Sequence, residues 1–186
     1  MLTNRKLNGI GMIEVLVTIL IVGIGMLAVA RMQIISMQAN HEAFQRSLAV
    51  QLGNDIIDKI RAVSSFNIAG YDAQVLGGNT ITAEPTPNCT GVVTSCTMNQ
   101  KIVHDLWEWE QLLDGSNELS AGVNSGGLIN ANGCINVSNN HIEVIIAWDG
   151  FSNAVKSTAV TAASNCGSLG ATALQKRRQI TIQTVI

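Results

Sequence analysis

An apolar segment near the N-terminus constrains this chain more than any other feature. Between Ile10 and Ala30 the sequence holds one charged residue, Glu14, and a short basic tip with Arg5 and Lys6 precedes the segment. A helix of this length extends about 31 Å, since each residue adds about 1.5 Å, and this matches the hydrocarbon core of a bilayer. A carboxylate inside a membrane span is costly, so Glu14 is expected to have a partner and a function.

The apolar segment continues into a second helical pattern. It is too long for the core of an ordinary secretory signal, and no small-residue cleavage site follows it. No proline occurs between Met32 and Ala62. Apolar residues recur there at every fourth position, namely Phe44, Leu48, Leu52, Ile56 and Ile60. This pattern predicts one helix from about Ile13 to Ser64 that is apolar all round in its first half. The second half is amphipathic, and its stripe is expected to be the core face of a head.

Beyond this helix the sequence predicts loops, a second helix and strands. From Ser65 onward, and again in Ser120–Gly133, glycine, proline and asparagine indicate loops. Asn99–Leu113 has the period of a short helix, which Asp114-Gly115 would end. Three segments alternate between apolar and polar residues: His141–Trp148, Ala154–Thr161 and Gln179–Ile186. They predict an antiparallel meander, which the amphipathic half of the long helix would cover. The expected fold class is α+β.

All four cysteines, Cys89, Cys96, Cys134 and Cys166, lie beyond the apolar segment. If that segment carries them across a membrane, they enter an oxidising compartment where two disulfides are expected. Four cysteines permit three pairings, and the sequence leaves these open. The spacing of Cys89 and Cys96 suits a small closed loop. A bond between Cys134 and Cys166 would bracket strands and stabilise the head by about 3–4 kcal/mol.

The sequence shows no catalytic, metal or cofactor site. It contains no nucleophile–histidine–acid set and no phosphate-binding loop, so we predict that the protein is not an enzyme and needs no cofactor. His104 and Glu108 lie four residues apart on one helix face and could share a metal ion, but a third ligand is missing from the pattern. Lys and Arg total 11 against 13 acids. With Lys176-Arg177-Arg178 as one small basic cluster, a nucleic-acid partner is not expected.

The N-terminal sequence resembles the class III signal of type IV prepilins. That signal is a short basic leader, a glycine, and an apolar helix with glutamate at the fifth mature position. Cleavage after Gly9 makes Ile10 the first residue and Glu14 the fifth, whereas cleavage after Gly11 would leave Glu14 third, so Gly9 is preferred. The resemblance implies removal of residues 1–9 by prepilin peptidase and N-methylation of Ile10. Glu14 would then pair with an N-terminal amine, its own or a neighbour's, and set the register of assembly.

Four segments look specifically like the PilV-type minor pilins, the type IV pilus modification proteins. They are GMIEVLVTILIVGIGMLAVARMQ near the start, His104–Leu113, Ile142–Asp149 and Ile180–Ile186. Two departures stand out. Ile10 and Gly11 occupy positions where many members have phenylalanine followed by threonine or serine. Arg31 stands where many major pilins have a proline at the end of the apolar helix.

The resemblance implies the type IV pilin fold. In this fold a long N-terminal helix has a transmembrane apolar half and an amphipathic half that packs on an antiparallel sheet, and here the C-terminal region bears the disulfides. The expected organisation is a leader (1–9), a transmembrane and filament-core helix (10–30), the amphipathic half of that helix (31–64) and a periplasmic head (65–186).

The implied function is that of a minor pilin, inserted in the inner membrane with its head in the periplasm and then incorporated in, or priming, a pilus at the cell surface. Roles in pilus assembly, adhesion or twitching motility follow from the resemblance. The implied partners are other minor and major pilins, the prepilin peptidase, the inner-membrane assembly platform, and membrane lipid before assembly. Two alternatives stay open: a minor pseudopilin of type II secretion, and a DNA-uptake pilin.

Overall fold

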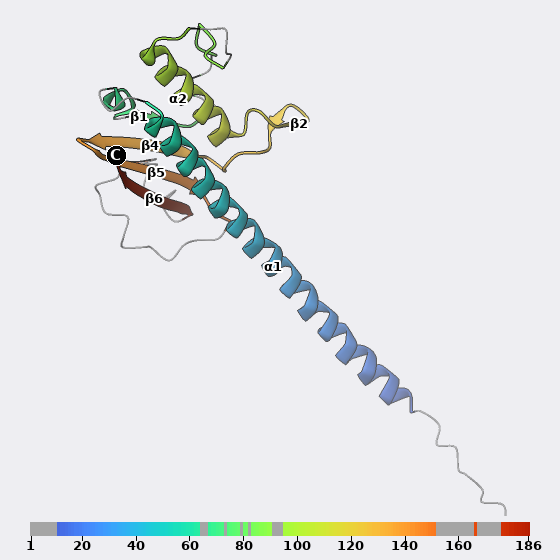
Figure 1. Ribbon diagram of the computed structural model, residues 1–186. Coiled ribbons are helices and arrows are strands. Elements are labelled where there is room, and N and C mark those ends of the chain that lie inside the picture. Colours follow the sequence, from blue (N-terminus) through green and yellow to red (C-terminus); the bar gives the residue numbers. More distant parts are fainter. Residues whose placement is uncertain are drawn as a thin grey trace, which may run out of the picture. The chain divides into compact units, whose positions relative to one another are not determined.

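A computed structural model of the protein provides its fold (Figure 1). The residues it describes are 11–63, 67–72, 74–78, 80–81, 83–90, 95–151, 166 and 176–186. The predicted leader, including Gly9, and the predicted strand Ala154–Thr161 lie outside the described residues. The chain divides into two compact units, Met1–His41 and Glu42–Ile186.

Helix α1 spans Met12–Arg61 and continues from the first unit into the second. These bounds agree with the predicted helix from Ile13 to Ser64. Every described side chain from Gly11 to His41 is exposed. In the second unit α1 buries one side, made of Gln45, Ala49, Leu52, Gly53, Ile56, Ile57 and Ile60.

The buried side of α1 differs from the predicted stripe at one end. The last three members of the stripe are buried and Leu48 is partly buried, but Phe44 is 62% exposed. An α-helix turns about 100° per residue, so positions four apart drift by about 40° per interval, and Phe44 lies about 160° around the helix from Ile60. In the turn that contains Phe44 and Leu48, the helix instead buries Gln45 and Ala49. The prediction that Phe44 belongs to the core face is therefore wrong.

Helix α2 spans Met98–Asp114 and has well-defined ends. Thr97 and Gln100 form a reciprocal capping box at its start, which satisfies backbone N–H groups that the first turn leaves without partners. Gly115 ends the helix in the left-handed conformation, with φ of 65°. A side chain at Gly115 would also collide with the backbone of Gly127, so glycine is required there on two grounds.

The main sheet has four antiparallel strands in the order β1-β4-β5-β6. The strands are Gln74–Leu76 (β1), Asn132–Ser138 (β4), His141–Asp149 (β5) and Arg177–Val185 (β6). A 3-10 helix, Ile68–Tyr71, precedes β1, and a small two-stranded sheet joins β2 (Leu119–Ser120) to β3 (Val123–Asn124). Among the described residues β5 therefore pairs with β4 and β6, and the predicted partner at 154–161 is outside them.

The sequence predicts β5 and β6 but not β4 or β1. Strand β4 begins with Asn132-Gly133, two residue types that are poor strand formers, so the pattern predicted a loop there. Gly133 is needed because an added Cβ would lie 2.3 Å from the indole of Trp109. A tight turn at Asn139, with φ of 54°, links β4 to β5.

The core of the second unit lies between the two helices and one face of the main sheet. Alternate residues of β5 point into it, as predicted: Ile142, Val144, Ile146 and Trp148. Ile180 and Ile182 of β6 pack against the same cluster. On the opposite face, Ile145 forms a separate small cluster with Cys134 and Cys166. The expected α+β class, with a helix packed on an antiparallel sheet, is confirmed.

Candidate functional site

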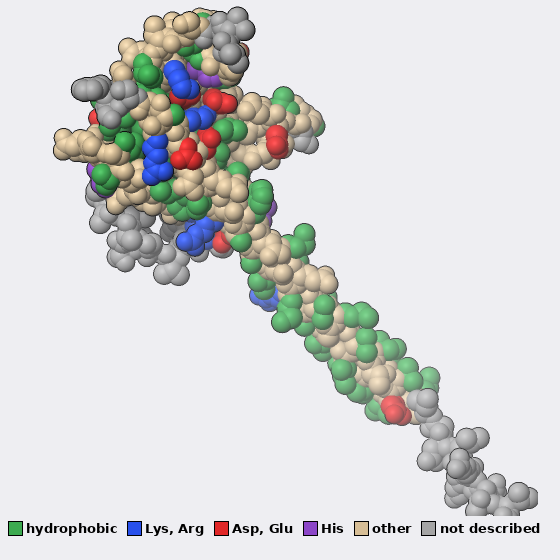
Figure 2. Space-filling view, viewed as in Figure 1, with side chains coloured by type: hydrophobic (Ala, Val, Ile, Leu, Met, Phe, Trp, Pro, Cys, Tyr) green, Lys and Arg blue, Asp and Glu red, His purple; other side chains and the backbone are tan. Residues whose placement is uncertain are grey.

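The first half of α1 exposes nearly all of its large apolar side chains. Figure 2 shows them along the visible face of the helix. By length and composition α1 could cross a membrane, and its most apolar 18-residue window carries no buried side chain. Between Glu14 and Arg31 the sequence has no charged residue. Exposure of apolar surface to water costs about 25 cal/mol per Å². Such a surface is therefore expected to contact lipid or other apolar helices.

Glu14 lies in the first turn of α1 and is exposed. A carboxylate at a helix N-terminus interacts favourably with the partial positive charge of the free backbone N–H groups. The predicted cleavage and methylation positions, Gly9 and Ile10, lie outside the described residues. Whether Glu14 meets an amine therefore stays a prediction.

Within the head, α2 supplies polar side chains that tie other elements together. The indole Nε1 of Trp109 donates to the backbone carbonyl of Leu52 in α1 at 2.9 Å. The hydroxyl of Tyr71 donates to Oδ2 of Asp105 at 2.8 Å, and both residues are buried. Burial, followed by the hydrogen bond to Asp105, raises the pKa of the Tyr71 phenol, so this group remains a donor at every physiological pH.

A second contact joins α1 to α2 through charged groups. Nζ of Lys59 lies 2.8 Å from Oε2 of Glu108 and 3.5 Å from Oδ2 of Asp55. The hydrogen bond from Lys59 is the largest influence on Glu108 and lowers the pKa of its carboxyl, against the opposing effect of burial. This position on the predicted helix face therefore carries a stable negative charge.

Glu110 has a structural role in the head that no sequence pattern predicts. It is fully buried, and its carboxylate accepts hydrogen bonds from four donors. These are the backbone N–H groups of Gly77, Thr80 and Ile81 and the hydroxyl of Thr80. The loop after β1 is thus held to α2 by one anion whose charge is matched by hydrogen bonds. In the sequence Glu110 follows Glu108-Trp109, and no local pattern distinguishes the buried Glu110 from the partly exposed Glu108.

The structure joins the cysteines as Cys89–Cys96 and Cys134–Cys166. The Cα atoms lie 5.9 Å and 5.7 Å apart, within the usual range for a disulfide. The expectation of a disulfide-bearing C-terminal region is confirmed.

Two residues of the predicted basic cluster, Arg177 and Arg178, form contacts within the head, whereas Lys176 is exposed. Arg177 forms a salt bridge with Asp149 at 3.2 Å, and its guanidinium also donates to Asn132. Arg178 forms a salt bridge with Glu42 of α1 at 3.1 Å. These contacts anchor β6, so the two arginines do not form an exposed basic stripe of the kind that binds a phosphate backbone.

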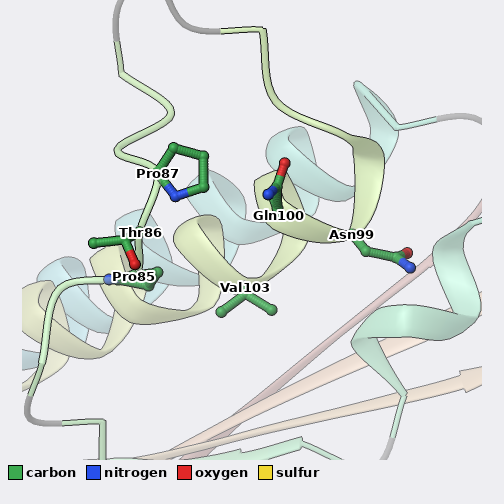
Figure 3. A pocket seen from close by; sticks show the side chains of 6 residues that line it. All are labelled: Pro85, Thr86, Pro87, Asn99, Gln100 and Val103. Atoms are coloured by element: carbon green, nitrogen blue, oxygen red, sulfur yellow. The ribbon is translucent and has the colours of Figure 1, made fainter.

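A small pocket of about 240 Å³ lies between the segment Pro85–Pro87 and the first turns of α2 (Figure 3). It is lined by Pro85, Thr86, Pro87, Asn99, Gln100 and Val103. These lining side chains are apolar or uncharged.

Residues 31–107 of the chain match the family named Tt1218-like, which is described as type IV pilin Tt1218. The matched range is less than half of the chain and begins after the apolar segment. The resemblance to prepilins rests mainly on that segment, so two different parts of the sequence support the same superfamily. No significant match was found among curated proteins or among solved structures.

The architecture has the features of the type IV pilin fold. A long N-terminal helix with an apolar first half packs its second half on a four-stranded antiparallel sheet, and the C-terminal region carries two disulfides. With the family match, this fold supports a pilin role for the chain. Pilins are structural subunits. These findings therefore favour a chain that associates with a membrane, with a pilus and with other pilins.

Proposed function

We propose that the chain is a minor pilin of a type IV pilus. The observation that carries the proposal is the exposed apolar half of α1, interrupted by one carboxylate at the fifth position after Gly9. In this proposal prepilin peptidase removes residues 1–9 and N-methylates Ile10. Residues 10–30 then serve first as a membrane span and later as a filament-core helix. Residues 31–64 connect this segment to a head that extends to residue 186.

The proposed mechanism is assembly, with Glu14 as the residue that sets register. In lipid, a lone carboxylate and a lone amine each lose hydration, so a pair is far less costly than two separate charges. When Glu14 pairs with the amine of Ile10 on a neighbouring subunit, the axial positions of the two helices are fixed. Before assembly, the head lies in the periplasm, whose oxidising chemistry suits its two disulfides.

Replacement of Glu14 by glutamine tests this mechanism. Glu14→Gln keeps size and polarity but removes the charge, so the subunit should remain in the membrane fraction and be depleted at least about tenfold from sheared pili, which corresponds to about 1.4 kcal/mol. Thr18→Val is the matched control, since Thr18 lies one turn further along the same exposed helix and bonds locally to Val15. Immunoblots of both fractions provide the measurement. Normal incorporation of Glu14→Gln would refute the register mechanism.

The cleavage site is tested with two glycine variants. Gly9→Ala should give an uncleaved precursor, whereas Gly11→Ala should still be processed to a chain that begins at Ile10. Intact-mass spectrometry distinguishes the two products and shows whether the new N-terminus carries one methyl group. Processing of Gly9→Ala together with failure of Gly11→Ala would move the cleavage site to Gly11.

Two alternatives make different predictions in a strain that lacks the protein. A minor pseudopilin would share the apolar helix, but its loss would impair type II secretion and leave pili intact. A DNA-uptake pilin would need exposed basic side chains, and the head instead uses Arg177 and Arg178 to hold β6. Pilus counts, secreted-enzyme activity and transformation frequency in the same strain separate the three functions.

A further inference from the structure

One face of α2 brings together three side chains that can bind a metal ion. His104, Asp105 and Glu108 each offer one ligand atom, and these atoms all lie within 4.8 Å of one another. At about 100° per residue, Asp105 and Glu108 lie about 100° and 40° around the helix from His104, so all three project from one side. The sequence pattern shows His104 and Glu108 as a pair, and the structure adds Asp105.

His104 is buried, and one of its ring nitrogens has no hydrogen-bond partner among the described residues. The residue is 3% exposed, and its Nε2 atom has no hydrogen-bond partner in the described part of the chain. A buried polar atom left in this state loses its hydration without a compensating hydrogen bond. The imidazole contacts the ring of Trp107, 5.6 Å away between centroids, and this contact gives Nε2 no hydrogen-bond partner. A bound cation would use the nitrogen lone pair.

The two carboxylates keep oxygen atoms available beside this imidazole. Among the described residues, Glu108 accepts one hydrogen bond, from Lys59 to Oε2, which leaves Oε1 for a ligand. Asp105 accepts from Tyr71 on Oδ2 at 2.8 Å. Its other oxygen, Oδ1, has only a long contact of 3.4 Å with Lys101. The Lys101 side chain is 44% exposed, so it can turn into solvent and release Oδ1.

The charges around the cluster favour a divalent cation. Asp55, Asp105 and Glu108 supply three negative charges, and Lys59 and Lys101 supply two positive ones. The net charge of these five side chains is therefore −1. When Lys101 turns away, the sum becomes −2. A divalent ion would neutralise it.

We propose that His104, Asp105 and Glu108 form a binding site for a divalent transition-metal ion of the zinc type. One imidazole nitrogen, Oδ1 of Asp105 and Oε1 of Glu108 are the protein ligands, and water completes the coordination. Zinc binds nitrogen and oxygen at about 2.0–2.2 Å, so the ligand atoms must close to about 3.3 Å by side-chain rotation. Calcium and magnesium are disfavoured because they prefer oxygen ligands in larger number.

Zinc titration of the full chain in detergent micelles, without a histidine tag and after treatment with a chelator, tests the site. Isothermal titration calorimetry should show one equivalent of Zn²⁺ per chain. Co²⁺ should quench the fluorescence of Trp107, which lies beside His104. His104→Gln should weaken Zn²⁺ binding at least about tenfold. His141→Gln, which removes an exposed imidazole from β5, should bind as the unmodified protein does.

A second variant keeps the test decisive if His104→Gln fails to fold. Lys101→Met removes the cation that competes for Oδ1 of Asp105, so it should tighten Zn²⁺ binding severalfold, an effect opposite in sign to general damage. Near-ultraviolet circular dichroism monitors the fold of each variant. The proposal is overturned if the folded, unmodified chain does not bind Zn²⁺. Equal affinities of the unmodified chain and Lys101→Met, or loss of binding in His141→Gln, would also overturn it.

Discussion

The two parts of α1 are built from similar apolar residues, but only the second part is covered by other elements of the same chain. Up to His41 every described side chain is exposed, whereas from Gln45 to Ile60 one side of the helix is buried by the sheet and α2. The second part is apolar on one side and polar on the other, and this suits a partner within the same chain. The first part is apolar all round, and this suits lipid or a bundle of like helices.

The difference shows that apolar content alone does not identify a core. The second part of α1 packs closely on the sheet. At Gly53, for example, an added Cβ would lie 2.5 Å from Cδ1 of Ile182. At Gly23 and Gly25 an added Cβ would meet nothing within 4 Å. The same residue type therefore marks a close approach in one part and open space in the other.

The largest expected contrast comes from one substitution made in both parts. Ile56 is fully buried and Ile24 is 62% exposed. Ile56→Ala should lower the free energy of unfolding of the head by about 2–5 kcal/mol, since it removes packed methylene groups and leaves a cavity. Ile24→Ala should change it by less than about 0.5 kcal/mol. Denaturation of the full chain in detergent, followed by the fluorescence of the buried Trp109 and Trp148, provides the measurement. Equal losses would contradict the division into two parts.

A second contrast concerns buried and exposed charge. Glu110→Ala should destabilise the head by about 2–4 kcal/mol, because it leaves the donors of the loop after β1 buried without an acceptor. Glu118→Ala, which removes an exposed carboxylate after the same helix, should have an effect below about 0.5 kcal/mol. The same denaturation experiment applies. If Glu110→Ala were as mild as Glu118→Ala, the carboxylate would not be what holds this loop.

Sequence patterns predicted the elements whose periodicity is long and regular. Both helices and the strands β5 and β6 are of this kind, because a repeated apolar spacing averages over local exceptions. Strand β4 was missed because it begins with Asn132-Gly133, where Gly133 leaves room for the indole of Trp109 although glycine is a poor strand former. Phe44 was misassigned because a spacing of four residues drifts around a helix of 3.6 residues per turn.

The polar sites of the head were less predictable because they depend on contacts between distant segments. Glu110 acts on a loop about 30 residues earlier. Asp105 accepts a hydrogen bond from Tyr71, 34 residues earlier in the sequence, and no local pattern predicts this contact. Neighbouring acids such as Glu108 have the same local context in the sequence but face other partners. Local pattern therefore located the helix that carries these side chains, and the tertiary fold decided their roles.

A smaller contrast uses the glycines of α1. Gly53→Ala should destabilise the head by about 1 kcal/mol, because the new methyl group displaces the terminal Cδ1 methyl of Ile182. Gly23→Ala meets open space and should instead strengthen its helix by about 1 kcal/mol, since alanine has the higher helix propensity. Denaturation measures the first effect, and amide hydrogen exchange across residues 20–30 measures the second. A stabilising Gly53→Ala would show that the Ile182 side chain can rotate away from the helix without loss of packing.

The smallest expected effect is a pH dependence confined to the head. Lys59 lowers the pKa of the Glu108 carboxyl in the folded chain, so this contact stabilises the head above the usual carboxyl pKa and loses its effect as the pH falls through the folded value. Because Glu108 is 42% exposed, the contribution should stay below about 1 kcal/mol. Glu108→Gln should therefore be less stable than the unmodified chain at pH 7, and the difference should shrink as the pH falls below the usual carboxyl pKa, measured with a chelator present so that metal binding does not contribute. Asp58→Asn, which breaks the exposed pair with Arg61, should show a smaller difference over the same pH range. A difference between Glu108→Gln and the unmodified chain that persists unchanged at pH 3 would mean that the side chain stabilises the head by packing rather than by charge.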